Sequence, residues 1–149
     1  SAFDQLYTAH TKEIAKTILS KPKLYETEII MKNLIEKILH NYYHIGYAMH
    51  IRLSRLVYDY KGFNEDEKKY ILHPWTHVDF IFYHKVSKEK LFVLEVDGIR
   101  YHEQSERQSS HDDIKDRVLK LNDIDIYRFK TNESQEENRL KNIIDKYVS

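Results

Sequence analysis

Cysteine is absent from the 149-residue sequence, which excludes disulfides and thiolate metal sites. Only three glycines are present, and none belongs to a glycine-rich phosphate-binding loop, so the chain carries no nucleotide-driven motor of that kind. No apolar stretch is long enough to cross a bilayer, and the N-terminus has no signal-peptide pattern. These absences predict a soluble, cytoplasmic protein with no membrane partner.

The formal net charge is zero, because 24 lysines and arginines balance 24 aspartates and glutamates. A strongly basic chain would argue directly for nucleic acid, so any nucleic-acid surface here must be a local patch. The content of 41% hydrophobic and 32% charged residues is typical of a globular domain, and the length suits one hydrophobic core. The sequence begins without methionine inside a helix-like pattern, from which we expect a domain of a longer protein.

Two apolar runs carry the acidic residues of greatest interest. In residues 91–97, four consecutive apolar positions, 91–94, lead into Glu95 and Asp97, which predicts a buried strand with both carboxylates on one face. Residues 77–83 form a second such run that contains Asp79. If the two runs pair as a hairpin, Asp79 comes close to Glu95. Buried carboxylates that converge in this way are ligands suited to Mg²⁺ or Mn²⁺.

Periodicity predicts the other elements. Helices are expected at residues 3–20, 24–43, 64–72, 111–121 and 134–147, and further strands at 45–53 and 126–130. Asn64 is the expected N-cap of its helix, and Ser134 with Glu137 forms an expected capping box. Residues 99–110 are expected to form a polar loop, and Trp75 a core or rim contact. The histidines show no metal-ligand spacing, so we expect no histidine cluster and no zinc site.

The fold class that follows is α/β. Its core order is helix, three strands, helix, strand, with a mixed central sheet flanked by helices and an extra N-terminal helix. Val78-Asp-Phe80, Leu94-Glu-Val-Asp-Gly98, His102 and Ile126-Tyr-Arg-Phe129 then resemble the motifs of the PD-(D/E)XK nuclease superfamily. The branch that they resemble most includes very-short-patch-repair endonucleases and the nuclease-like C-terminal domains of superfamily-one helicases.

The resemblance covers residues 23–149 and leaves 1–22 as a helical extension or linker. It implies a restriction-endonuclease-like core and a Mg²⁺- or Mn²⁺-dependent deoxyribonuclease. The implied substrate is DNA, with RNA as an alternative. It also implies fusion to, or association with, a helicase, repair or defence module.

The resemblance assigns metal binding to Asp79, Glu95 and the backbone carbonyl of Val96, and further catalytic roles to Asp97 and His102. The superfamily usually has lysine at the position of Asp97. An aspartate can act as a ligand or a general base, but it cannot supply positive charge. His102 is the first candidate for that role, and the alternative is a loop histidine bonded to the backbone.

Four residues are candidates for supporting or phosphate-contacting roles: Glu28, Asp112, Lys115 and Arg128. Glu28 is either an acid that approaches the metal site or one that stabilises the start of its helix. Lys115 and Arg128 can contact phosphate. For Asp112 we favour a structural ion pair with Arg128 or Lys115.

Three interpretations remain open. The first is an active nuclease. The second is a catalytically inactive module of the same fold that binds nucleic acid or a protein partner. In the third, the domain is purely structural, and Arg128 and Lys115 neutralise Asp79 and Glu95.

Overall fold

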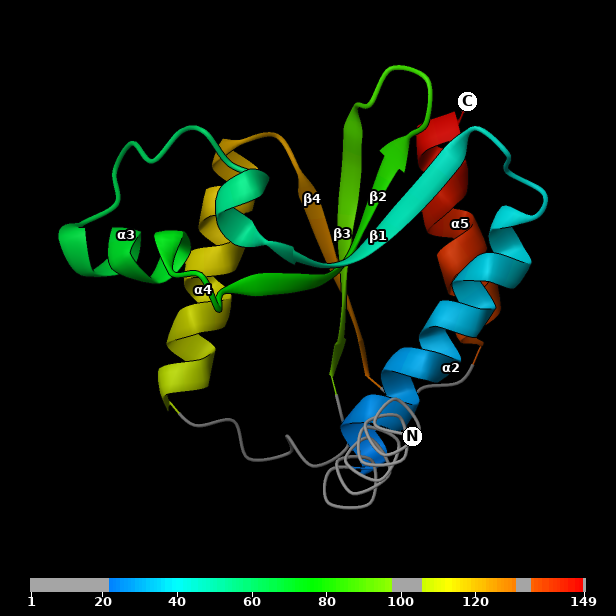
Figure 1. Cartoon of the computed structure of the whole chain (residues 1–149), viewed down its shortest axis with the longest axis horizontal. Coiled ribbons are helices and arrows are strands. Elements are labelled where there is room, and N and C mark those ends of the chain that lie inside the picture. Colours follow the sequence, from blue (N-terminus) through cyan, green and yellow to red (C-terminus); the bar gives the residue numbers. More distant parts are fainter. Residues whose placement is uncertain (1–21, 98–105, 131–134, 149) are drawn as a thin grey trace, which may run out of the picture.

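The computed structural model describes residues 22–97, 106–130 and 135–148. These residues form an α/β domain with one four-stranded mixed sheet (Figure 1). The elements are α2 (Pro22–Leu39), β1 (Ile45–Arg52), the short 3₁₀ helix η1 (Leu53–Arg55), α3 (Glu65–Leu72), β2 (His77–His84), β3 (Lys90–Asp97), α4 (Glu106–Leu121), β4 (Asp125–Lys130) and α5 (Glu136–Val148). The helix expected at 3–20, His102 and the Ser134 cap lie outside the described residues.

The sheet has the order β1-β2-β3-β4. β2 is antiparallel to both β1 and β3, which confirms the predicted hairpin. β4 is parallel to β3 and is reached through α4, as a parallel pair requires a crossover connection. The predicted core order of helix, three strands, helix and strand is therefore confirmed in the described residues.

Helices cover the sheet on both sides (Figure 1). α2 and α5 pack on one face over a core that includes four buried phenylalanines, Phe80, Phe82, Phe92 and Phe129. η1, α3 and α4 contribute to a second core on the other face, which includes Leu53, Ile71, Val93, Ile114 and Val118. None of the helices in the described ranges combines the length and apolar character needed to cross a membrane.

Several helix boundaries differ from the predictions. α2 begins at Pro22, a residue that the first turn of a helix tolerates because its missing N–H has no partner there. Glu28 therefore lies beyond the first turn, and its predicted role at the helix start is wrong. α4 begins at Glu106 rather than at residue 111, so residues 106–110 are helical and not loop. Their polar side chains precede the docked part of the helix, which is why no apolar period marks them.

Hydrophobicity alone also misplaced two side chains. Trp75 is 83% exposed, so the core position among its two predicted ones is wrong. The helical period of residues 111–121 predicts that Leu121 shares a buried face with Ile114 and Val118. Leu121 is instead exposed, and the buried face of α4 uses Leu119. In contrast, Asn64 forms the predicted N-cap of α3, completed by a capping box with Glu67.

Asn122, at the turn between α4 and β4, ties this turn to the segment after η1. Its Oδ1 accepts hydrogen bonds from the backbone N–H groups of Tyr58 and Asp59, and its Nδ2 donates to the carbonyls of Asp59 and Val118. The side chain is buried, so its removal leaves buried backbone groups unsatisfied.

We expect Asn122→Ala to lower the free energy of unfolding by about 2 kcal/mol, measured by urea denaturation. Asp123→Ala, in the same turn, is not a matched control because Asp123 has a positive φ of 61°. Lys120→Ala on the exposed side of α4 is suitable. Equal stability of the Asn122 and Lys120 variants would show that the hydrogen bonds of Asn122 do not stabilise the fold.

Candidate functional site

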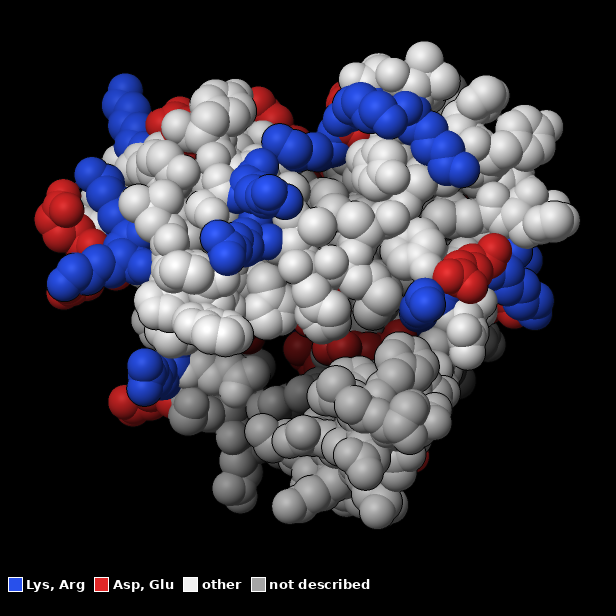
Figure 2. All heavy atoms as spheres, in the orientation of Figure 1, with Lys and Arg blue, Asp and Glu red and all other residues white. Residues whose placement is uncertain are grey.

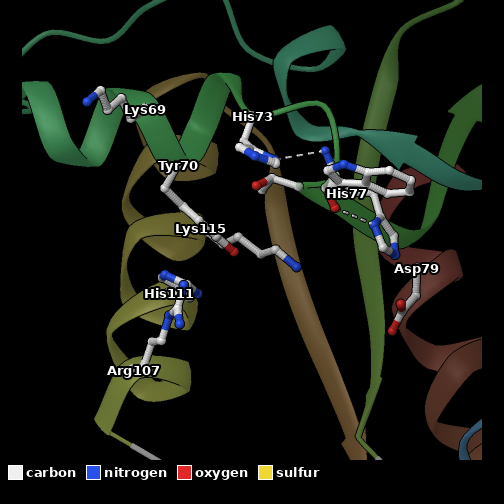
Figure 3. Close-up of a pocket in the computed structure, with 10 residues that line it drawn as sticks. Lys69, Tyr70, His73, His77, Asp79, Arg107, His111 and Lys115 are labelled. Carbon is white, nitrogen blue, oxygen red and sulfur yellow. Dashed lines mark hydrogen bonds between the residues drawn. The ribbon is translucent and has the colours of Figure 1, made fainter.

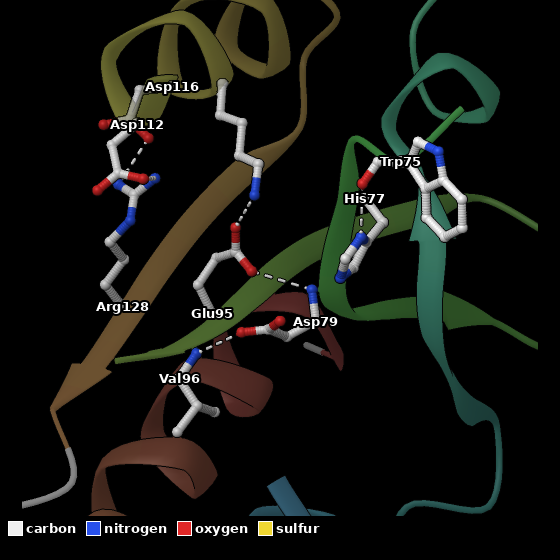
Figure 4. A network of polar contacts seen from close by, with 9 residues as sticks. Trp75, His77, Asp79, Glu95, Val96, Asp112, Asp116 and Arg128 are labelled. Atoms are coloured by element: carbon white, nitrogen blue, oxygen red, sulfur yellow. Dashed lines mark hydrogen bonds and ion pairs between the residues drawn. The ribbon is translucent and has the colours of Figure 1, made fainter. Parts of the chain in front are cut away.

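Asp79 and Glu95 lie where β2 and β3 stop pairing. The regular register begins at Phe80–Leu94, and beyond it the two carboxyl groups bridge the strands. The Asp79 N–H donates to Glu95 Oε2 at 2.9 Å, and the Val96 N–H donates to Asp79 Oδ2 at 2.9 Å (Figure 4). The predicted proximity of the two carboxylates is confirmed.

Lys115 reaches this pair from α4. Its Nζ lies 2.6 Å from Glu95 Oε1, and the two side chains are 14% and 8% exposed. Burial opposes the charge on Glu95, but Lys115 and the hydrogen bonds with Asp79 together hold the pKa of Glu95 below its usual value. Burial likewise opposes the charge on Lys115, yet Glu95 raises the pKa of Lys115. The pair is therefore ionic at neutral pH.

The environment of Asp79 instead favours its protonated carboxyl group. Burial raises the pKa of Asp79 to about 8, repulsion from Glu95 adds to the rise, and the Val96 N–H opposes it. In the part of the chain that the structure describes, no lysine or arginine forms an ion pair with Asp79. One buried carboxylate, Glu95, thus pairs with the partly buried Lys115, whereas Asp79, which is partly buried, has no cationic partner of its own among the described residues.

Arg128 on β4 contacts different acids. It donates to Asp116 Oδ1 at 2.7 Å and lies 3.8 Å from Asp112. The preferred structural pairing of Asp112 with Arg128 is confirmed, whereas the proposed neutralisation of Asp79 or Glu95 by Arg128 is wrong. Asp97 is half-buried at the end of β3. Burial raises the pKa of Asp97, Arg128 opposes the rise, and Asp112 and Glu95 add to it.

A family model described as "Protein of unknown function (DUF2726)" matches residues 21–147. The chain belongs to this family. No curated protein and no solved structure matches the chain. The matched segment of this family member contains every candidate site residue named above, from Glu28 to Arg128.

Two histidines that sequence reasoning missed lie beside Asp79. His50 on β1, His77 on β2 and Asp79 each offer a ligand atom, and these atoms lie within 4.8 Å of one another. The expectation that the histidines form no cluster is therefore wrong. Glu28 accompanies them, since its Oε2 lies 3.1 Å from His50 Nε2. Spacing along the chain could not reveal this cluster, because His50 and His77 come from different strands.

An open pocket of about 430 Å³ leads to Asp79 (Figure 3). α3 and the segment after it line one side and α4 lines the other, and together they contribute Lys69, His73, Arg107, His111 and Lys115. Trp75 is also at this pocket. Elsewhere on the face shown in Figure 2, positive side chains lie over η1 and the β2–β3 turn. At the pocket itself, three cationic side chains, Lys69, Arg107 and Lys115, accompany Asp79.

Asp79 and Glu95 place carboxylate oxygens at this centre, and such oxygens are the ligands that Mg²⁺ and Mn²⁺ prefer in proteins. Each carboxylate oxygen has two lone pairs, so the bonds from Lys115 and the Asp79 N–H leave Glu95 further capacity. His102 lies outside the described residues.

Proposed function

We propose that this DUF2726 domain is a Mg²⁺- or Mn²⁺-dependent nuclease with a restriction-endonuclease-like core, acting on DNA. One observation carries the proposal: Asp79 and Glu95 converge from paired strands, and Lys115 approaches them from α4 and pairs with Glu95. The element order and the mixed sheet support it. The resemblance to helicase-fused domains adds that it acts within a larger helicase, repair or defence protein.

Asp79, Glu95 and the Val96 carbonyl would hold the cation. Bound there, it supplies positive charge that polarises a phosphodiester and activates water for attack. Among the described residues, Lys115 is the positive group that contacts this centre, and it can supply charge that Asp97 cannot. Because Lys115 contacts Glu95 and also lines the pocket, it can contact a phosphate that enters beside Asp79.

The pocket wall supports a phosphate-bearing substrate. Lys69 from α3 and Arg107 from α4 both line the pocket, and Arg107 can bind phosphate through two parallel hydrogen bonds. The exposed indole of Trp75 offers a surface on which an unpaired base can stack. Phosphate contacts of this kind position any nucleic acid without reading its sequence.

One observation favours the inactive alternative, a nuclease-fold module that only binds nucleic acid or a protein partner. Both oxygens of Glu95 already accept hydrogen bonds, one from Lys115 and one from the Asp79 backbone. A carboxylate held in this way can serve the packing of β2, β3 and α4 without a metal ion. Metal-dependent cleavage separates the two functions.

The test is a cleavage assay with single- and double-stranded DNA and RNA, in Mg²⁺, in Mn²⁺ and in EDTA. Wild type is compared with Asp79→Asn and Glu95→Gln, and with Glu89→Gln as a control that removes a charge from the exposed β2–β3 turn. We expect metal-dependent cleavage that both site variants lose and the control retains. A folded wild type that cleaves none of these substrates would overturn the proposal, and retained binding would then favour the inactive module.

A further inference from the structure

His50 faces Asp79 across the β1–β2 pair. The flanking pairs are Met49–Phe80 and Ile51–Val78, so the register places His50 opposite Asp79. His77 precedes Asp79 by two residues on β2, which places both on the same side of the strand. The three ligand atoms therefore converge because of strand register.

Hydrogen bonds fix the tautomer of each ring. His77 Nδ1 lies 2.9 Å from the Trp75 carbonyl (Figure 4), and a carbonyl only accepts, so this nitrogen carries the proton and Nε2 keeps its lone pair. His50 Nε2 lies 3.1 Å from Glu28 Oε2, so Nδ1 of His50 keeps the lone pair when the ring is neutral. Partners of this kind orient the rings of metal-binding histidines.

The backbone of His50 supplies a second observation. Its φ is 52°, a left-handed conformation that is unfavourable for a residue with a side chain. The hydrophobic side chains on either side of it, Met49 and Ile51, pack against different cores. The alternation of side chains along β1 is thus interrupted at His50, so that Met49 and Ile51 point to opposite faces of the sheet. If the left-handed conformation only served to interrupt the strand, glycine or asparagine would be favoured at this position, yet the residue here is histidine.

We propose that His50, His77 and Asp79 bind a divalent transition-metal ion of the zinc class. Two imidazoles and one carboxylate suit Zn²⁺, Co²⁺ or Fe²⁺ better than Mg²⁺. Ligand atoms around one tetrahedral zinc ion lie about 3.4 Å apart, so binding draws the three groups closer together. His50, with a side chain 47% exposed, has room for this movement. Glu28 is a positioning residue that orients the His50 ring.

This site shares Asp79 with the proposed nuclease centre, but it does not depend on hydrolysis. The nuclease proposal requires Glu95 and oxygen ligands, whereas the transition-metal site requires the two histidines. The variants Glu95→Gln and His77→Ala therefore separate the two proposals.

The experiment uses the full chain after dialysis against EDTA. Co²⁺ is titrated and followed by its visible absorption bands, Zn²⁺ is used as a competitor, and excess Mg²⁺ is tested for displacement. We expect one Co²⁺ per chain, displaced by Zn²⁺ and retained in excess Mg²⁺. His77→Ala and His50→Asn are expected to weaken binding at least tenfold, and asparagine tolerates the left-handed conformation at residue 50.

Three further variants test which residues the metal site requires. Glu28→Gln should weaken Co²⁺ binding by about 10-fold to 100-fold, whereas Glu95→Gln and His44→Ala, outside the cluster, should leave it within threefold. Melting in EDTA confirms that each variant is folded. No saturable Co²⁺ or Zn²⁺ binding by the wild type, or binding unchanged in both histidine variants, would overturn the site. Histidine-dependent Co²⁺ binding without any cleavage would leave this site standing and remove the nuclease proposal.

Discussion

Replacing Lys115 with methionine is expected to lower the free energy of unfolding at pH 7 by about 3–5 kcal/mol, the usual cost of removing one member of a buried ion pair. Methionine keeps most of the apolar length of the side chain, so the loss is mainly electrostatic. Glu95 then keeps its burial and loses the contact at 2.6 Å that stabilises its charge. Urea denaturation of the metal-free protein measures the difference.

A double variant separates charge from packing. Glu95→Gln retains an oxygen for the Asp79 N–H and removes the charge, so Glu95→Gln/Lys115→Met should recover most of the stability lost in Lys115→Met alone. Lys69→Met, also at the pocket but on α3, is the matched single control and should change stability little. If the free energy of unfolding of Lys115→Met lies within about 0.5 kcal/mol of the wild-type value, Lys115 does not neutralise Glu95, and its proposed role at the centre fails.

The convergence of Asp79 and Glu95 could be predicted because it depends on local features. Alternation along each run sets which way the side chains point, and a short turn between the runs sets their pairing. The contact of Lys115 with Glu95 depends on how far along the sheet α4 lies. Periodicity shows which face of a helix is buried, but it does not give this position.

The histidine cluster depends on features that no single segment contains. His50 reaches Asp79 through the register of β1 on β2, and strand pairing between distant segments is weakly encoded in either segment alone. The positive φ at His50 breaks the alternation that the prediction of its strand used. Trp75 was misplaced for a related reason: its size favours burial on average, but here it follows a helix end and lies at an open pocket.

Asp79→Asn is expected to separate stability from activity. In EDTA-treated protein, asparagine keeps an oxygen for the Val96 N–H, and its amide can donate to Glu95 as a protonated Asp79 does. It also removes a charge that burial and Glu95 both oppose. We therefore expect the variant to be more stable than the wild type by on the order of 2 kcal/mol at pH 8, while cleavage falls by at least about 10³-fold.

The sign of the pH dependence follows from the raised pKa. Because the pKa of Asp79 rises from 3.8 in the unfolded chain to about 8 in the folded one, the folded state holds a proton that the unfolded state has released between these values. The contribution of Asp79 to stability therefore falls as pH rises through this window, and the asparagine side chain of the variant does not titrate there. The stability advantage of Asp79→Asn should be smallest below about pH 4 and should grow as the pH rises to about 8, measured by urea denaturation in EDTA.

Added Mn²⁺ should make the wild type more stable than Asp79→Asn. A ligand that binds only the folded state stabilises it by mass action, so the melting temperature of the wild type should rise with Mn²⁺ and that of Asp79→Asn should not. Asp66→Asn, on the exposed first turn of α3, controls for the loss of one negative charge. A variant less stable than the wild type at pH 8 in EDTA would mean that the Asp79 carboxylate itself holds β2 to β3, which is the structural interpretation of the site.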